Sequence, residues 1–223
     1  MTTEVLAHDT MQQSKPWVSS TIGLLVTIGL MSMPLGHWLG QFQNLGHMIL
    51  TEMAFWSIVA IALLYVFFVE RRPLSSVGLR KPSAADLALA VAAGAFIVAL
   101  LAAIYLMIFP ALHWSENGQF KNVSTIPYWL QCMVVVRAAV SEEITFRGYG
   151  IERVQELTGS RSIAGLLTWS VFTLDHLSFW GWHHLLVAGS AGAVLTLFYL
   201  WRRNLWASML AHFIVDAVGF LAK

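Results

Sequence analysis

The stretch VVVRAAVSEEITFRGYG, from Val134 to Gly150, places charged side chains in a segment otherwise typical of a membrane helix. Its charged residues are Arg137, Glu142, Glu143 and Arg147. A charged group at the centre of a bilayer costs roughly 2.5–3.5 kcal/mol on insertion scales. A charge at that depth therefore indicates function by default, and two adjacent carboxylates in an apolar helix need a chemical reason.

The composition around this stretch indicates an integral membrane protein. Of the 223 residues, 57% are hydrophobic and only 11% are charged, against roughly 25% charged in soluble domains. The net charge of +1 gives no reason to expect a nucleic-acid partner. Cys132 is the single cysteine, which excludes an internal disulfide and a cysteine-based zinc cluster.

Hydropathy predicts an all-α, polytopic bundle of about seven transmembrane helices, because a spanning helix needs about 20 mostly apolar residues. Residues 1–17 form a polar tail rather than a cleavable signal, and 18–223 form a single transmembrane domain. The first three expected spans are apolar, whereas the last four carry polar residues at membrane depth. The expected spans are Val18–Leu39, Met48–Val69, Leu87–Phe109, Pro127–Phe146, Ile163–Phe179, His184–Trp201 and Asn204–Ala222.

The basic residues predict an orientation in the membrane. With seven spans, ten of the 13 Lys and Arg residues fall on one side, which the positive-inside rule makes cytoplasmic. The N-terminus is then cytoplasmic and the C-terminus is on the other side. The ten residues are Lys15, Arg71, Arg72, Arg80, Lys81, Arg147, Arg153, Arg161, Arg202 and Arg203.

Helical geometry separates the two neighbouring glutamates. Glu143 and Arg147 are i and i+4 with the acid first, which is the favourable order for an ion pair within a helix. Glu142 is rotated about 100° from Glu143 around the helix, so it is poorly placed to share the arginine. We therefore expect Glu143 to be structural and Glu142 to be free for proton transfer.

The segment that follows leaves two possibilities open. Residues 149–157 could continue the fourth helix into the cytosol, or break away and lie at the membrane interface. If the helix continues to a hairpin tip at Gly159, Glu142 and His176 are both 17 residues from that tip. The spacing then permits the two side chains to face each other at one height.

Histidines follow in two further helices. His176 shares a helix face with Phe172 and has Asp175 beside it, whereas His183 and His184 follow a Trp-Gly-Trp break and are expected to be structural residues at the interface.

In the last span His212 and Asp216 are i and i+4, so the carboxylate can accept the imidazole N–H and fix its tautomer. Glu142, His176, His212 and Asp216 could converge from three helices in one of two ways. Glu142 and His176 activate water while the other two stabilise an oxyanion, or the histidines and carboxylates bind a metal that activates water. Both arrangements hydrolyse an acyl bond. The sequence has no His-Glu-x-x-His motif of the zincin type.

Three motifs in order resemble the CAAX protease and bacteriocin-processing family (CPBP, also called Abi), which includes the Ras-converting CAAX endopeptidases. The family patterns are Glu-Glu-x-x-x-Arg, Phe-x-x-x-His and His-x-x-x-Asn. Here they correspond to EEITFR (Glu142–Arg147), FTLDH (Phe172–His176) and HFIVD (His212–Asp216). The resemblance covers roughly Leu74–Phe220 and includes the flanking SSVGLRKPS and NLWASMLAH.

The resemblance implies that Glu142 and His176 activate water and that His212 and position 216 form the oxyanion site. The remaining motif residues would be structural supports: Glu143, Arg147 and Phe172. Position 216 departs from the pattern, because Asp stands where the family commonly has Asn. An ionised carboxylate cannot donate to an oxyanion, so Asp216 would be protonated, orient His212 or bind a metal.

We favour a metal-free mechanism, because the motif set contains only two histidines. Zinc is the alternative cofactor, with Glu142, His176 and His212 as its ligands. The expected protein is an intramembrane endopeptidase of a prokaryotic plasma membrane, acting on a lipidated CAAX peptide, a leader peptide or another membrane-associated protein. The alternatives are a non-proteolytic scaffold or bacteriocin immunity protein, and a small transporter or proton pathway.

Overall fold

The computed structural model describes residues 16–115, 123 and 125–221, and in these ranges the chain is all-α. Residues 1–15 of the expected polar tail lie outside the described residues. Within these described ranges, three helices are long and apolar enough to cross a membrane: Leu45–Val69, Ala84–Ala111 and His184–Arg202. Two shorter apolar helices, Trp17–Met31 and Leu205–Leu221, accompany them, so the chain is a multi-pass membrane protein.

The quoted stretch lies in the central rod of the bundle. Helix α8 (Tyr128–Glu142) continues through the π-helical segment η4 (Glu143–Ile151) into α9 (Glu152–Thr158). The helix therefore continues past Gly150, which resolves the two possibilities that the sequence left open. It ends at Gly159, whose positive φ of 70° suits glycine. The Ser160 side chain then caps α10 (Arg161–Asp175), and the two helices form the expected hairpin.

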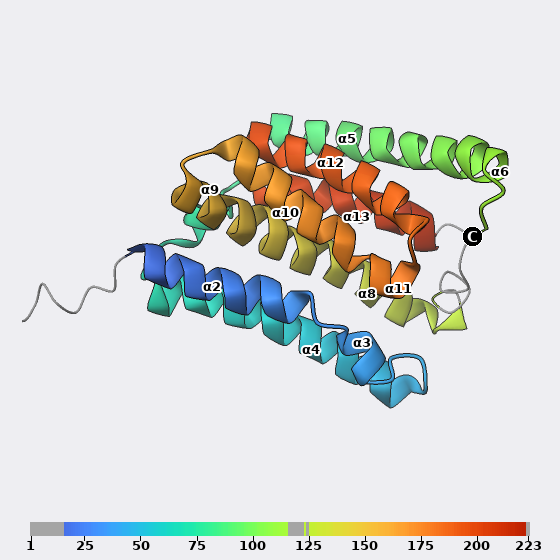
Figure 1. Ribbon diagram of the computed structural model, residues 1–223, viewed down its shortest axis with the longest axis horizontal. Coiled ribbons are helices and arrows are strands. Elements are labelled where there is room, and N and C mark those ends of the chain that lie inside the picture. Colours follow the sequence, from blue (N-terminus) through green and yellow to red (C-terminus); the bar gives the residue numbers. More distant parts are fainter. Residues whose placement is uncertain (1–15, 116–122, 124, 222–223) are drawn as a thin grey trace, which may run out of the picture.

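The other helices surround this rod (Figure 1). On one side lie α2 (Pro16–Met31) and α4 (Leu45–Leu64), which η1 (Tyr65–Val69) extends. On the other side α13 (Leu205–Leu221) packs against α8 and against α5 (Ala84–Ala103). Helix α12 (His184–Arg202) packs on α10 and α5. The short elements are η2 (Leu74–Val77), η3 (Ile104–Ile108), α6 (Phe109–Ala111), α3 (Leu35–Trp38) and α11 (Leu177–Trp180).

The first expected span, Val18–Leu39, is wrong as a single helix. Helix α2 ends at Met31, and α3 is a separate short helix that begins at Leu35. Pro34 lies at this break; it has no backbone N–H to donate, and it disfavours the helical conformation in the residue before it. The break brings residues 32–43 over the end of the bundle, where they form part of the cavity described below.

Apolar side chains on the outer helices face outward. Leu25, Met53, Phe67, Leu106 and Leu197 are each more than half exposed. Helices α4 and α5 bury little of their surface in the protein, as lipid-facing helices do. Helix α8 shows the reverse pattern, because its buried residues include Gln131, Arg137 and Ser141. The polar groups that carry the predicted chemistry therefore lie inside the helix bundle.

Candidate active site

Glu142 and Glu143 stand at the junction of α8 and η4, and their surroundings differ completely. The Glu143 side chain is 0% exposed and accepts hydrogen bonds from Arg147 Nη1 at 2.9 Å and from His212 Nδ1 at 3.0 Å. The Glu142 side chain is 16% exposed, and its Oε2 lies 3.8 Å from His212 Nε2. Glu143 is thus enclosed by its two partners, whereas Glu142 is open to the cavity.

Arg147 joins three helices behind the glutamates. Its Nη1 pairs with Glu143, its Nη2 donates to the Gly192 carbonyl at 3.2 Å, and its guanidinium carbon lies 4.1 Å from the centre of the Phe172 ring. A Cβ on Gly192 would stand 2.7 Å from Phe172 Cε1, so α12 can approach this closely only with glycine there. The ion pair that the i, i+4 spacing predicts is present, and it fixes η4 against α10 and α12.

His176 is held in one tautomer at the end of α10. Its Nδ1 lies 2.8 Å from the Phe172 carbonyl oxygen. Because a carbonyl oxygen can only accept, Nδ1 must be the donor, and Nε2 of the neutral ring keeps its lone pair. The Phe172 ring packs on the imidazole with centroids 4.7 Å apart, and Phe146 packs on Phe172 at 5.4 Å. This arrangement leaves His176 Nε2 able to accept a proton.

His212 on α13 contacts carboxylates at both ring nitrogens. Nδ1 faces Glu143, while Nε2 lies 3.5 Å from Asp216 Oδ2 and 3.8 Å from Glu142 Oε2. The His212–Asp216 proximity follows from their spacing. The contact with Glu143 joins residues 69 positions apart and was not predicted. Glu143 therefore holds both Arg147 and His212, not Arg147 alone.

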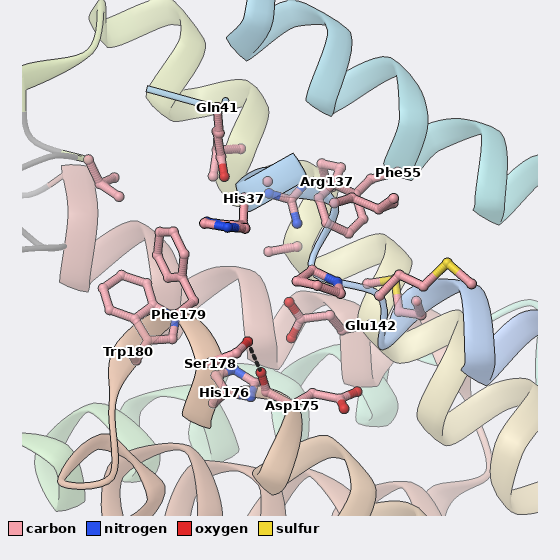
Figure 2. Close-up of a pocket in the computed structure, with 18 of the residues that line it drawn as sticks. His37, Gln41, Phe55, Arg137, Glu142, Asp175, His176, Ser178, Phe179 and Trp180 are labelled. Carbon is pink, nitrogen blue, oxygen red and sulfur yellow. Dashed lines mark hydrogen bonds between the residues drawn. The ribbon is translucent and has the colours of Figure 1, made fainter. Parts of the chain in front are cut away.

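All four candidate catalytic residues line one cavity of about 950 Å³. Figure 2 shows Glu142 projecting into it, with Asp175 and His176 on the wall below. Helix α8 contributes Glu142, α13 contributes the pair His212 and Asp216, and His176 directly follows the end of α10. Residues 31–37 and 40–43 form much of the opposite wall.

A second buried ion pair lies at the same cavity, and the sequence analysis did not predict it. Arg137 lines the cavity, and its Nε approaches Glu52 Oε2 on α4 at 3.2 Å. The guanidinium stacks over Phe55 at 4.4 Å. Glu52 is 2% exposed and lies inside the expected span Met48–Val69, which was taken as apolar. A lone carboxylate in that span was the signal that could have pointed to it.

Further contacts lie at or near the cavity. Ser32 Oγ donates to Asp175 Oδ2 at 2.7 Å and so ties the end of α2 to the residue before His176. His183 packs among Trp114, Trp182 and Phe109 in an aromatic cluster. His184 lines the cavity, stacking on Trp180 at 4.9 Å and standing 6.1 Å from the His176 ring.

The residues proposed as zinc ligands do not fit a metal in this arrangement. Within the described residues, no group of three or more His, Cys, Asp or Glu side chains is placed to hold an ion. Glu142 and His212 are close to each other, but His176 does not join them in a three-donor set.

A comparison with known protein families matches the part of the chain that carries the candidate site. Residues 122–218 match the family model described as "Type II CAAX prenyl endopeptidase Rce1-like". The matched range contains all three motifs and every candidate catalytic residue. No curated protein and no solved structure matches the chain.

Proposed function

We propose that the chain is an intramembrane endopeptidase, on the premise that residues 122–218 match the family model of the Rce1-like type II CAAX prenyl endopeptidases. The observation that carries the proposal is the convergence of Glu142, His176, His212 and Asp216 on one cavity in a multi-pass membrane protein. A carboxylate open to the cavity and a histidine with a free Nε2 are the groups that a water-activating site requires.

The proposed reaction begins with a water molecule held between Glu142 and His176. As the water oxygen bonds to the peptide carbonyl carbon, the Glu142 carboxylate takes up one of its protons while His176 Nε2 accepts a hydrogen bond from the other O–H. The carbonyl oxygen becomes an oxyanion, which His212 stabilises by donating from Nε2. The oxyanion then re-forms a carbonyl as the carbon–nitrogen bond breaks, and the departing amine receives the proton that Glu142 held.

Glu143 and Asp216 have positioning roles in this proposal. A histidine whose Nδ1 donates to Glu143 can present a proton on Nε2 only as the imidazolium. Carboxylates around the ring stabilise that cation, and Asp216 lies on the Nε2 side. The aspartate thus supports the donor instead of donating itself, which reconciles a carboxylate at 216 with an oxyanion role for His212.

We further propose that residues 18–223 form a single domain of about seven transmembrane helices, with a cytoplasmic N-terminus, in a prokaryotic plasma membrane. The substrate is a membrane-associated protein or peptide. The family description makes a prenylated CAAX peptide the first candidate, and a leader peptide is the second.

Purified protein in detergent tests the proposal, with fluorogenic prenylated CAAX and leader peptides as substrates. The parent should cleave at least one of them, and Glu142→Gln and His176→Ala should each reduce cleavage by about 10²-fold or more. Glu156→Gln is the matched control, because Glu156 is 42% exposed and remote from the cavity. Cleavage by Glu142→Gln at the parent rate would contradict the proposal.

A further inference from the structure

The buried ion pair of Glu52 and Arg137 lies at the cavity wall but takes no part in the proposed reaction. The two side chains are 3% and 9% exposed, and Arg137 lines the cavity. Glu52 accepts hydrogen bonds from Arg137 Nε at 3.2 and 3.3 Å and from Nη2 at 3.3 Å. The Phe55 ring covers one face of the guanidinium, at 4.4 Å. Glu52 and Phe55 therefore fix the guanidinium at one edge and one face.

The other edge of this guanidinium faces no hydrogen-bond partner among the described residues. An arginine carries five N–H groups, and Glu52 accepts from Nε and Nη2, whereas Nη1 donates to no group in that part of the chain. Polar groups as buried as this one normally have hydrogen-bond partners. Figure 2 shows Arg137 beside Phe55, on the cavity wall above Glu142. A ligand in the cavity can therefore supply the acceptor for Nη1.

The charge of the pair limits which acceptor fits. Glu52 already neutralises the guanidinium, so a second carboxylate on Arg137 would be repelled by Glu52 across the same group. A neutral acceptor forms the hydrogen bonds without that repulsion, and bonds from a charged donor are stronger than bonds between neutral groups. A peptide carbonyl oxygen is such an acceptor, and each residue of a polypeptide has one. The pair thus suits the backbone of a polypeptide better than an anionic group.

The position of Arg137 on α8 relates it to the reacting bond. Arg137 precedes Glu142 by five positions within the same helix, which is a rise of about 7.5 Å along its axis. A substrate strand running along α8 advances about 3.3 Å per residue, so the rise corresponds to about two residues. We propose that Arg137 is a substrate-binding residue, whose Nη1 donates to a backbone carbonyl oxygen about two residues from the scissile bond. This inference rests on the proposed function and adds a substrate contact to it.

Peptide binding tests this contact without requiring cleavage. The full chain carries Glu142→Gln, so that bound peptides stay intact, and fluorescence anisotropy of labelled prenylated CAAX and leader peptides is compared with protein-free micelles. Arg137→Lys keeps a cation for Glu52 but has no second edge to offer a ligand. Glu52→Gln combined with Arg137→Gln removes both charges and leaves no unpaired charge buried. Each should raise the Kd of the best-bound peptide by about tenfold or more, the usual effect of losing a hydrogen bond from a charged group.

An ion pair elsewhere in the bundle provides the matched control. Asp86→Asn combined with Arg202→Gln removes the pair between α5 and α12, and neither residue lines the cavity. The Kd should then stay within about twofold of the background, because the two sites share no partner. Thermal unfolding of the same preparations separates a lost contact from a lost fold, since Arg137→Lys should unfold close to the background temperature.

A backbone scan of the peptide tests the same contact and needs no further variant. Replacing one peptide bond at a time with an alkene removes a single carbonyl oxygen, and the parent's cleavage products locate the scissile bond. One replacement, about two residues from that bond, should weaken binding to the background as much as Arg137→Lys does. The same replacement should weaken binding to Arg137→Lys no further.

Three results would overturn the proposal. In the first, the Arg137 variants fold and bind like the background, or the scan finds no sensitive carbonyl. In the second, the effect of Arg137→Lys is confined to peptides with a free C-terminal carboxylate and is absent from their amides, which would identify a carboxylate as the ligand. In the third, no peptide binds. Binding that depends on Arg137, without cleavage by the parent, would instead refute the proposed activity alone.

Discussion

Replacing each of the two adjacent glutamates with glutamine should produce opposite defects. Glu143→Gln removes the charge that pairs with Arg147, and the two side chains are 0% and 1% exposed. Leaving a buried charge without its partner costs about 3–5 kcal/mol of unfolding free energy. For a chain of this length, on the scale of soluble domains, that corresponds to a melting temperature lower by about 6–20 °C.

Glu142→Gln should behave differently, because Glu142 has no ion pair closer than the 3.8 Å approach to His212 and is partly open to the cavity. We expect its unfolding free energy to stay within about 1 kcal/mol of the parent, as for substitutions away from buried networks. Its peptidase activity should fall by about 10²–10⁴-fold, the usual contribution of a general base.

Thermal unfolding in detergent, followed by fluorescence of the ten tryptophans, measures the stability of both variants. Cleavage of the best fluorogenic peptide is measured on the same preparations. The reasoning is refuted if Glu143→Gln melts with the parent, or if Glu142→Gln is the less stable of the two. Either result would mean that the burial difference does not separate a structural carboxylate from a reactive one.

Substitutions at two other positions, Asp216 and Gly192, test the support of the site. Asp216→Asn should keep cleavage within about tenfold of the parent, because Glu142 and Glu143 still place carboxylates beside the His212 ring and the amide keeps a polar group there; Asp216→Leu should lose about 10²-fold or more. Equal damage by both variants would show that the negative charge itself is required. Gly192→Ala should lower the unfolding free energy by about 1–3 kcal/mol, because its Cβ would stand 2.7 Å from Phe172. Gly29→Ala is the matched control in calorimetry, since nothing lies within 4 Å of its Cβ and alanine favours the helix.

Much of the fold follows from patterns that are local in the sequence. Long apolar runs predict helices, and the limits of α4 and α12 lie within a few residues of the expected spans. The first span failed because Pro34 interrupts a run that is otherwise apolar enough. Hydropathy averages over such a break, whereas the backbone cannot continue a helix smoothly through it.

In the candidate site, contacts within one helix could be predicted from the sequence, whereas contacts between helices could not. Contacts between residues one helical turn apart could be predicted, namely Glu143 with Arg147 and His212 with Asp216. The bond between Glu143 and His212 could not, because it joins different helices.

The sequence by itself determined that this chain is a helical membrane protein with charged groups at membrane depth, because periodicity and hydropathy act over a few turns. Only the tertiary structure decided which of those charges meet. Arg137 pairs with Glu52, which is 85 positions away in the sequence. Ser32 donates a hydrogen bond to Asp175, which is 143 positions away. The tertiary structure also decided that Glu142, His176, His212 and Asp216 line one cavity, because a cavity is a property of how helices pack and no single helix contains it.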